Sequence, residues 1–275
     1  LLAGCGADNQ PSGGNYQAPA NSDAGTQASA PAENVTIRVG ATPAPHVQIL
    51  EQVVDVLAEQ GITLEIETIN DYNTPNDGVE DGSLDANYFQ HITYMNGYNA
   101  DNGTHLVSVG EIHYEPLGLY AGKTDSIDAL PDGAQIAVPN DTTNEARALL
   151  LLEQEGLLTL AEGAGINATV LDIVDNPKNL EFVELEAAQI PTRLADVDMA
   201  VINGNYAMGA GMSIADALAI ESSEGTAATA YANVVAVKEG NENNEAILAL
   251  VEALKSDEVK AYMEETFQGS VVPLF

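Results

Sequence analysis

Tryptophan is absent from this 275-residue chain, and cysteine and basic residues are scarce. A single cysteine, Cys5, excludes an internal disulfide bond. Only 8 lysines and arginines stand against 42 acidic residues, which gives a formal net charge of −34. A surface this negative repels nucleic acid and anionic membranes, so both are excluded as electrostatic partners. Solubility, for example in a salty habitat, and docking to a partner are explanations of the acidity that the sequence leaves open.

Long apolar runs are also missing. Beyond the first residues we find no run of about eighteen or more apolar residues, so we expect no transmembrane helix. The hydrophobic fraction of 45% is nevertheless normal for a soluble globular protein. The length suits one large domain or two of ordinary size, so we expect a folded body with a real core.

The N-terminus indicates a lipid anchor. The first six residues, LLAGCG, resemble the end of a bacterial lipoprotein signal peptide that is cut before the cysteine. Cleavage would leave Cys5 as an N-terminus that carries lipid, such as palmitate; an ordinary free cysteine is the alternative. Residues 6–34 contain no Val, Leu, Ile, Met or Phe, which predicts a flexible tether with a reach of roughly 30 Å. The sequence thus predicts a lipoprotein on the extracytoplasmic face of the cell membrane.

Regular secondary structure is expected from Val35 onward. Residues 35–39 and 62–66 alternate apolar and polar side chains, as strands do, and they flank helical spacing at 50–57. Such a βαβ pattern is typical of a parallel sheet covered by helices. Further strands are expected at 135–138, 170–174, 182–185, 199–202 and 233–237, and further helices at 142–156, 247–254 and around 259–263. Two successive α/β units predict two lobes, with a ligand between their strand ends.

Arginine is rare enough for its positions to be informative. Only Arg38, Arg147 and Arg193 occur. Arg147 falls in the second turn of a helix that Thr142 is expected to cap, with Glu145 completing a capping box. A cation is mildly unfavourable there, and no side chain three or four positions away is acidic. Two explanations remain: a surface arginine paired with a distant carboxylate, or a site for the carboxylate of a ligand.

The few aromatic residues cluster in one segment, SLDANYFQHITYM. Within it Tyr88, Phe89, His91 and Tyr94 fall within seven residues, although the whole chain has 4 Phe and 10 Tyr. The rings either fill the core or line a pocket. Because neighbours on a strand point to opposite faces, Tyr88 is expected in the core if Phe89 lines a pocket.

Asparagines adjoin two predicted strands. Asn203 and Asn205 follow the strand that ends at Ile202, and Asn233 begins another. Carboxamides both donate and accept hydrogen bonds, so they can hold the charged groups of an amino acid. Asparagine is also a common turn residue, and that structural explanation stays open for each of them.

Motifs of catalysis and metal binding are missing. The chain has no G-x-S-x-G elbow, no Walker loop and no H-E-x-x-H, and its only cysteine belongs to the predicted anchor. The histidines are scattered, although His113 with Glu115 offers half of a metal site. We therefore expect no enzyme, no cofactor and no bound metal.

Longer motifs identify a family. They are VGATPAPHVQILE, DYNTPN, GSLDANYFQH, NPKNLEFVELEAAQIP, VINGNYA and YANVVAVKEGNEN. These motifs resemble the methionine-binding lipoprotein (NlpA-type) family, the substrate-binding components of ABC importers for methionine. The similarity runs from about Val35 to Phe275. It implies a periplasmic-binding-protein fold of two α/β lobes, with residues 35–121 and 231–275 in one lobe and 122–230 in the other.

The resemblance also implies a function and a set of site residues. A monomer would capture methionine, with the L-enantiomer expected, and deliver it to the membrane subunits of an ABC importer. The ligand contacts would be Tyr72, Phe89, His91 and Tyr94 around the side chain, Arg147 with Asn144 at the carboxylate, and Asn205 and Asn233 at the amino and carboxylate groups. The alternatives are another small amino acid, a methionine derivative or dipeptide, or a surface lipoprotein with a scaffold or adhesion role.

Overall fold

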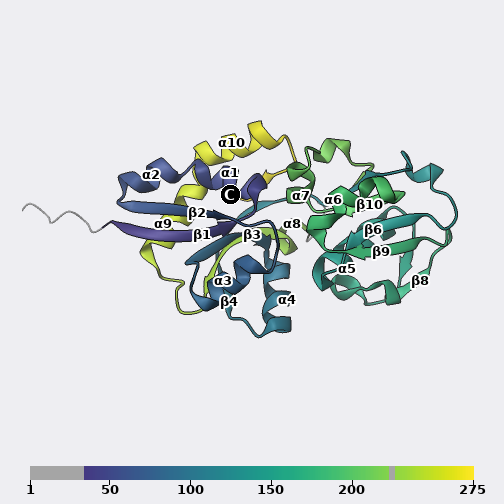
Figure 1. Cartoon of the computed structure of the whole chain (residues 1–275), viewed down its shortest axis with the longest axis horizontal. Coiled ribbons are helices and arrows are strands. Elements are labelled where there is room, and N and C mark those ends of the chain that lie inside the picture. The colour runs from purple at the N-terminus through teal and green to yellow at the C-terminus, as the bar shows by residue number, and fades with distance from the viewer. Residues whose placement is uncertain (1–33, 223–226) are drawn as a thin grey trace, which may run out of the picture. The chain divides into compact units, whose positions relative to one another are not determined.

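The computed structural model describes residues 34–222 and 227–275 (Figure 1). Cys5 with its predicted lipid, and the predicted tether as far as residue 33, lie outside these ranges. The described chain forms two main β-sheets with helices packed on them, so the expected α/β fold class is confirmed. None of the described helices is both long enough and apolar enough to cross a membrane.

Six strands form the first sheet: β1 (Val35–Ala41), β2 (Ile62–Thr68), β3 (Ala86–His91), β4 (Leu106–Tyr114), β12 (Ala232–Lys238) and β13 (Val272–Pro273). Their order is β13-β4-β12-β3-β1-β2. β1 runs parallel to β2 and β3, whereas β12 is antiparallel to both β3 and β4. The C-terminal strands β12 and β13 therefore complete a sheet begun by the first eighty residues of the described chain.

Five strands form the second sheet: β5 (Gly118–Ala121), β6 (Gln135–Pro139), β9 (Glu181–Leu185), β10 (Met199–Ile202) and β11 (Ala219–Ile220). Their order is β11-β5-β10-β6-β9, and β6 runs parallel to both β9 and β10. β5 pairs with β10 and β11, although the sequence-based boundary put it with the first lobe. The other lobe limits stay a prediction. A separate small pair joins β7 (Thr159–Leu160) and β8 (Ile173–Asp175).

Helices connect the strands of both sheets. The α-helices are α1 (Gln48–Glu51), α2 (Val54–Glu59), α3 (Thr74–Asp81), α4 (Ile92–Asn102), α5 (Thr142–Gln154), α6 (Ile190–Arg193), α7 (Gly204–Gly209), α8 (Ala227–Ala230), α9 (Glu245–Leu254) and α10 (Asp257–Phe267). Shorter helical turns are η1 (Pro43–Val47), η2 (Ile127–Ala129), η3 (Gly165–Asn167), η4 (Val170–Asp172), η5 (Ala187–Gln189), η6 (Leu194–Asp196) and η7 (Ile214–Asp216).

Each main sheet has its own hydrophobic core. Ile37 of β1 packs in one cluster with Leu250 and Leu254 of α9, whose spacing of four residues puts both on one helix face. Ile136 of β6 and Leu149 of α5 belong to a second cluster. All five side chains are almost completely buried. Full burial of one such side chain contributes about 1.5–3 kcal/mol, so these clusters hold the sheets that carry the pocket residues.

The chain crosses between the two sheets in short segments. It leaves the first sheet at the end of β4, passes through Glu115 and enters the second sheet at β5. It leaves the second sheet at the end of β11, where Glu221 follows, and returns at β12. Both glutamates are buried, at 6% and 9% exposure. Burial of a carboxylate is costly unless it is paired, so the partners of these two residues are of special interest.

Most of the predicted elements are confirmed. The strands β1, β2, β6, β9, β10 and β12 and the helices α9 and α10 lie where the periodicity put them. The helix expected at 50–57 is split into α1 and α2 by a turn. The strand expected at 170–174 is wrong in its first half, because η4 occupies residues 170–172 and only 173–175 form β8.

The predicted cap of α5 is also wrong by one residue. Asp141, not Thr142, is the N-cap, and its Oδ1 accepts a 2.9 Å hydrogen bond from the backbone N–H of Asn144. Glu145 does not close a capping box, because its carboxylate accepts from the backbone N–H of Val170, 25 residues away. Aspartate is at least as good an N-cap as threonine, so the residue before Thr142 can take this position.

Candidate functional site

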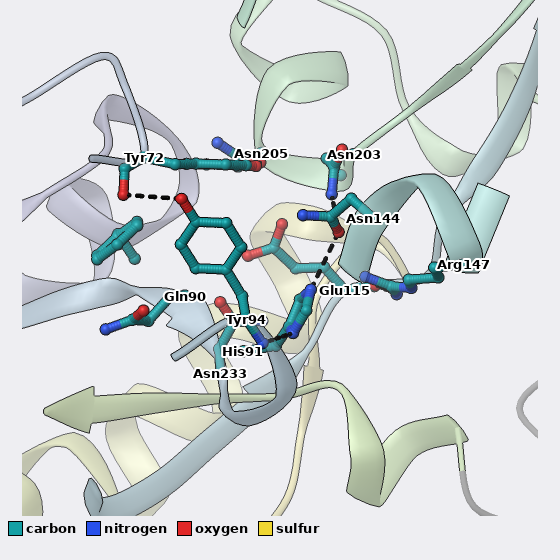
Figure 2. Close-up of a pocket in the computed structure, with 12 residues that line it drawn as sticks. Tyr72, Gln90, His91, Tyr94, Glu115, Asn144, Arg147, Asn203, Asn205 and Asn233 are labelled. Atoms are coloured by element: carbon teal, nitrogen blue, oxygen red, sulfur yellow. Dashed lines mark hydrogen bonds between the residues drawn. The ribbon is translucent and has the colours of Figure 1, made fainter. Parts of the chain in front are cut away.

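A pocket brings together all eight ligand contacts that the sequence predicts (Figure 2). It encloses about 330 Å³ of space that no protein atom fills, part of it open to solvent. Its lining residues are Tyr72, Phe89, Gln90, His91, Tyr94, Glu115, Asn144, Arg147, Asn203, Gly204, Asn205 and Asn233. Four of these, Gln90, Glu115, Asn203 and Gly204, are absent from the predicted set.

Aromatic rings form one wall of the pocket. The ring centroid of Tyr72 lies 5.8 Å from that of Phe89 and 5.4 Å from that of Tyr94. Phe89 stands near the end of β3, and Tyr94 lies in the first turn of α4, which begins directly after the strand. Tyr88 points elsewhere and is fully buried in the core of the first sheet. The aromatic segment thus serves both purposes, as core at Tyr88 and as pocket wall at its neighbours.

His91 links this wall to the second sheet. Its Nδ1 accepts a 3.0 Å hydrogen bond from the backbone N–H of Tyr94, which caps α4. Its Nε2 must then carry the proton and donates to Asn144 Oδ1, also at 3.0 Å. Burial and the nearby charge of Arg147 lower the pKa of His91 to about 3, so the ring is neutral at physiological pH.

Asn144 is saturated by protein partners. Its Oδ1 accepts from His91 and from Nδ2 of Asn203 at 2.9 Å, as the dashed lines in Figure 2 show. Its Nδ2 donates to both carboxylate oxygens of Asp141. This side chain therefore positions its neighbours, and its hydrogen bonds leave little capacity for a ligand.

Arg147 is held by a buried ion pair. Its Nε donates to Glu221 Oε2 at 2.8 Å, and its Nη2 donates to Glu221 Oε1 and to the backbone carbonyl of Glu115. The Tyr231 ring lies 4.2 Å from the guanidinium carbon. Burial alone would raise the pKa of Glu221. The charge and hydrogen bonds of Arg147, with the hydrogen bonds from Tyr114 and the Leu117 N–H, together outweigh this effect, so this pKa is lowered. Arg147 is thus paired with a distant carboxylate, as one of the two sequence-based explanations has it, but it is buried and not a surface residue.

The ion pair leaves one nitrogen of the Arg147 guanidinium without a hydrogen bond to the described residues. Nη1 of Arg147 makes no hydrogen bond to any described residue, while the side chain lines the pocket. Nδ2 of Asn205 and Nδ2 of Asn233 likewise donate to no described residue. The pocket therefore presents three nitrogen donors that have no partner among residues 34–222 and 227–275, and such donors can bind a carboxylate.

Glu115 lies at the centre of a buried network on the other side. Its Oε1 is 2.8 Å from Nε2 of His113 and 3.3 Å from Nε2 of His46. Both rings carry their proton on Nε2, because His113 donates from it to the Glu115 carboxylate and His46 donates from it to Asn233 Oδ1 at 3.0 Å. Their Nδ1 atoms then accept from hydroxyl groups, Thr42 for His46 and Tyr88 for His113. Burial lowers the pKa of His46 to about 4, although Glu115 opposes this shift, and burial lowers the pKa of His113 to about 3.

The same three side chains have the composition of a metal site. The sequence offered His113 with Glu115 as half of such a site, and the structure adds His46, with candidate ligand atoms within 4.8 Å of one another. Hydrogen bonds already engage every one of these ring nitrogens. The arrangement thus satisfies two neutral histidines around one carboxylate without requiring an ion.

Gly204 makes room for Glu115. A Cβ atom at this position would lie 2.9 Å from Glu115 Oε2 and 3.0 Å from Glu115 Cβ. We expect Gly204→Ala to lower the free energy of unfolding by about 1–3 kcal/mol, the usual cost of overpacking. Gly209 ends the same helix α7, and a Cβ there would meet nothing within 4 Å. Gly209→Ala is therefore the matched control in urea denaturation and should be neutral or stabilising. Equal losses in both variants would contradict the tight contact.

Comparison with known proteins places this chain among lipoproteins and substrate-binding proteins. A model of the NlpA lipoprotein family matches residues 37–275. The D-methionine-binding lipoprotein MetQ of Escherichia coli (strain K12) is 41% identical over 240 residues, which cover 86% of this chain and 87% of that protein. A solved nutrient binding protein from Burkholderia cenocepacia bound to methionine shares 43% identity and a TM-score of 0.81, over 87% of this chain and 100% of that one. An ABC transporter periplasmic substrate-binding protein from Coxiella burnetii shares 44% identity and a TM-score of 0.81, over 86% and 99%.

Proposed function

Because the chain belongs to the NlpA lipoprotein family, we propose that it is a substrate-binding lipoprotein that captures methionine and delivers it to an ABC importer. One observation carries the proposal: a single pocket combines an aromatic wall with unpartnered nitrogen donors. A zwitterionic amino acid with an apolar side chain needs both. The similarity to a methionine-bound structure of the same fold supports methionine among such amino acids.

The aromatic wall would hold the side chain of methionine. A thioether is apolar and polarizable, and sulfur packs favourably against aromatic edges and faces. Tyr72, Phe89 and Tyr94 present three rings whose centroids lie 5.4 to 6.2 Å apart. The hydroxyl of Tyr72 donates to Asn205 Oδ1 at 2.5 Å, so this ring also orients a donor group of the polar side.

The donor side would hold the α-carboxylate. Nη1 of Arg147 and the Nδ2 atoms of Asn205 and Asn233 are the three groups that can donate to it. Two of these residues stand next to the second sheet, on α5 and α7, and Asn233 belongs to β12 of the first. A ligand held by donors from both sheets would favour a closed arrangement, which is how binding drives a population shift.

We infer binding without catalysis. The histidine that lines the pocket, His91, is neutral and engaged on both nitrogens, which leaves it no free lone pair to act as a base. Names of solved relatives describe nutrient and substrate-binding proteins. Capture followed by release to a transporter requires only closure and opening around the ligand.

Attachment to the membrane would come from the N-terminus. We propose that Cys5 carries lipid and that residues 6–34 tether a monomeric binding body to the extracytoplasmic face of the cell membrane. The family name describes lipoproteins, and the tether composition favours a flexible chain. Mass spectrometry of Cys5 in protein purified from membranes would test the lipid directly.

Calorimetric titration with L-methionine tests the function. The protein is unfolded and refolded first, so that any ligand acquired during expression is removed. We expect one-site binding with a micromolar Kd or tighter, because an apolar side chain and a charged group would be bound together. D-methionine, a methionine dipeptide and other small amino acids serve as competitors that rank the ligand class. Absence of heat with every amino acid, from correctly refolded protein, would contradict the proposal and favour a scaffold role.

A further inference from the structure

The ammonium group of an amino acid requires hydrogen-bond acceptors. The side-chain oxygens of the predicted partners, Asn205 and Asn233, are each already engaged by a protein donor. Asn205 Oδ1 already accepts from the Tyr72 hydroxyl at 2.5 Å, and Asn233 Oδ1 accepts from Nε2 of His46 at 3.0 Å. Their remaining groups are donors, which repel an ammonium and suit a carboxylate. Acceptors of the pocket that no protein side chain engages are therefore the stronger candidates for the ligand nitrogen.

Asn203 and Glu115 supply two such acceptors in the pocket lining. Neither was among the eight predicted ligand contacts, although Asn203 was one of the asparagines that the sequence analysis considered. Among the described residues, Asn203 Oδ1 is the one buried side-chain oxygen that has no hydrogen-bond partner. Glu115 supplies the other acceptor, a carboxylate with 6% exposure. Its Oε1 accepts from Nε2 of His113 and lies 3.3 Å from Nε2 of His46, whereas its Oε2 faces the backbone of Gly204 and meets no side-chain donor among the described residues. Burial of Asn203 Oδ1 without a partner costs free energy, and a ligand that donates a hydrogen bond to it would remove this cost.

The charges around the pocket single out Glu115. Arg147 is the nearest cation, and Glu221 already balances it, while Arg147 reaches only the backbone carbonyl of Glu115. His46 and His113 are neutral donors and bring no positive charge. Burial raises the pKa of Glu115. The electrostatic influence of His46 and Arg147 and a hydrogen bond from the Asn205 backbone N–H oppose this rise only in part. Glu115 is thus a buried carboxylate whose counterion is missing among the described residues.

We propose that Glu115 and Asn203 together form the subsite for the protonated α-amino group of the ligand. This inference rests on the proposed function, because it assumes that an amino acid occupies the pocket. The neutral His113 donates a hydrogen bond to the Glu115 carboxylate, the neutral His46 packs beside it, and Gly204 leaves space next to it. The substrate class follows: amino acids with a free, protonated α-amino group bind, and deaminated or N-acylated analogues bind poorly.

The test compares two ligands on matched variants. Calorimetry measures the Kd of L-methionine and of 4-(methylsulfanyl)butanoate, which keeps the thioether and the carboxylate but lacks the amino group. We expect the wild-type protein to prefer L-methionine at least 10-fold. Glu115→Gln should weaken L-methionine binding at least 10-fold and change the Kd of the deaminated ligand less than about 3-fold, because only the ammonium contact is lost. Glu184→Gln removes the same charge from an exposed strand position and should change neither Kd.

The outcomes separate the two proposals. If wild-type protein does not bind L-methionine, the proposed function fails and the ammonium subsite fails with it. If wild-type protein binds L-methionine but Glu115→Gln leaves that affinity unchanged, or weakens both ligands equally, the function stands and the subsite is overturned. Asn203→Leu should reduce the same preference, and this variant decides the matter if Glu115→Gln does not fold. Glu115→Asp, which keeps the charge, should retain a larger share of the preference than Glu115→Gln.

Discussion

Arg147→Ala should lower the free energy of unfolding by about 3–5 kcal/mol, because it strands the Glu221 carboxylate in the protein interior. Glu221 is 9% exposed, and its other donors, the Tyr114 hydroxyl and the Leu117 N–H, are neutral. The measurement is urea denaturation at neutral pH. Arg193→Ala is the control, because Arg193 and Asp196 form an exposed pair whose loss costs no more than about 1 kcal/mol. A loss in Arg147→Ala as small as that of the control would contradict the buried pair.

A double variant separates the structural role of Arg147 from ligand binding. Arg147→Met with Glu221→Met replaces the whole buried pair by apolar side chains, an exchange that is often neutral for stability. We expect this protein to recover most of the stability lost in Arg147→Ala. Its affinity for L-methionine should stay at least 10-fold below that of the wild type, because the donor to the carboxylate is gone. Recovery of both properties would contradict the proposed carboxylate contact of Arg147.

Mild acid should destabilise the protein through three buried histidines. The pKa values of His46, His91 and His113 are lowered to about 4, about 3 and about 3, chiefly by burial, from 6.5 in the unfolded chain. The unfolded state therefore takes up protons first as the pH falls below 6.5. Each histidine then removes about 1.4 kcal/mol of stability per pH unit, so the three together remove about 4 kcal/mol per unit. The loss begins below pH 6.5 and continues until the folded-state pKa values are reached.

Other buried groups modify this slope in known directions. Burial raises the pKa values of Glu115 and Asp141, so these carboxyls take up protons in the folded state first and offset part of the loss at the acid end. Glu221, whose pKa is lowered, adds its own loss only below about pH 4.5. Urea denaturation between pH 7 and pH 5.5 measures the histidine term. His113→Gln should reduce the slope by about one proton, and a wild-type stability that is flat over this range would contradict neutral buried histidines.

Local pattern by itself determined much of this protein. Alternation along β1 and β2 and the apolar spacing of α9 predict these elements correctly, because side-chain direction repeats every two residues in a strand and every 3.6 in a helix. The longer motifs also led to the correct family, and with it to eight residues that line one pocket. The assignment of individual residues to the ligand site depended on the resemblance. Spacing alone could not decide whether the aromatic cluster fills the core or lines a pocket.

Only the tertiary structure decided the partners of the buried charges. Glu221 lies 74 residues from Arg147 and follows a two-residue strand, so no local pattern marks it as the counterion. Tyr72 and Asn205 are 133 residues apart, and their hydrogen bond determines that Asn205 offers a donor to the pocket. Glu115 appeared in the sequence only beside His113. Glu115 is buried beside His46 and His113 because the chain crosses there from one sheet to the other. Contacts between residues so far apart in the sequence are set by the packing of whole strands and helices, and not by the residues next to each group.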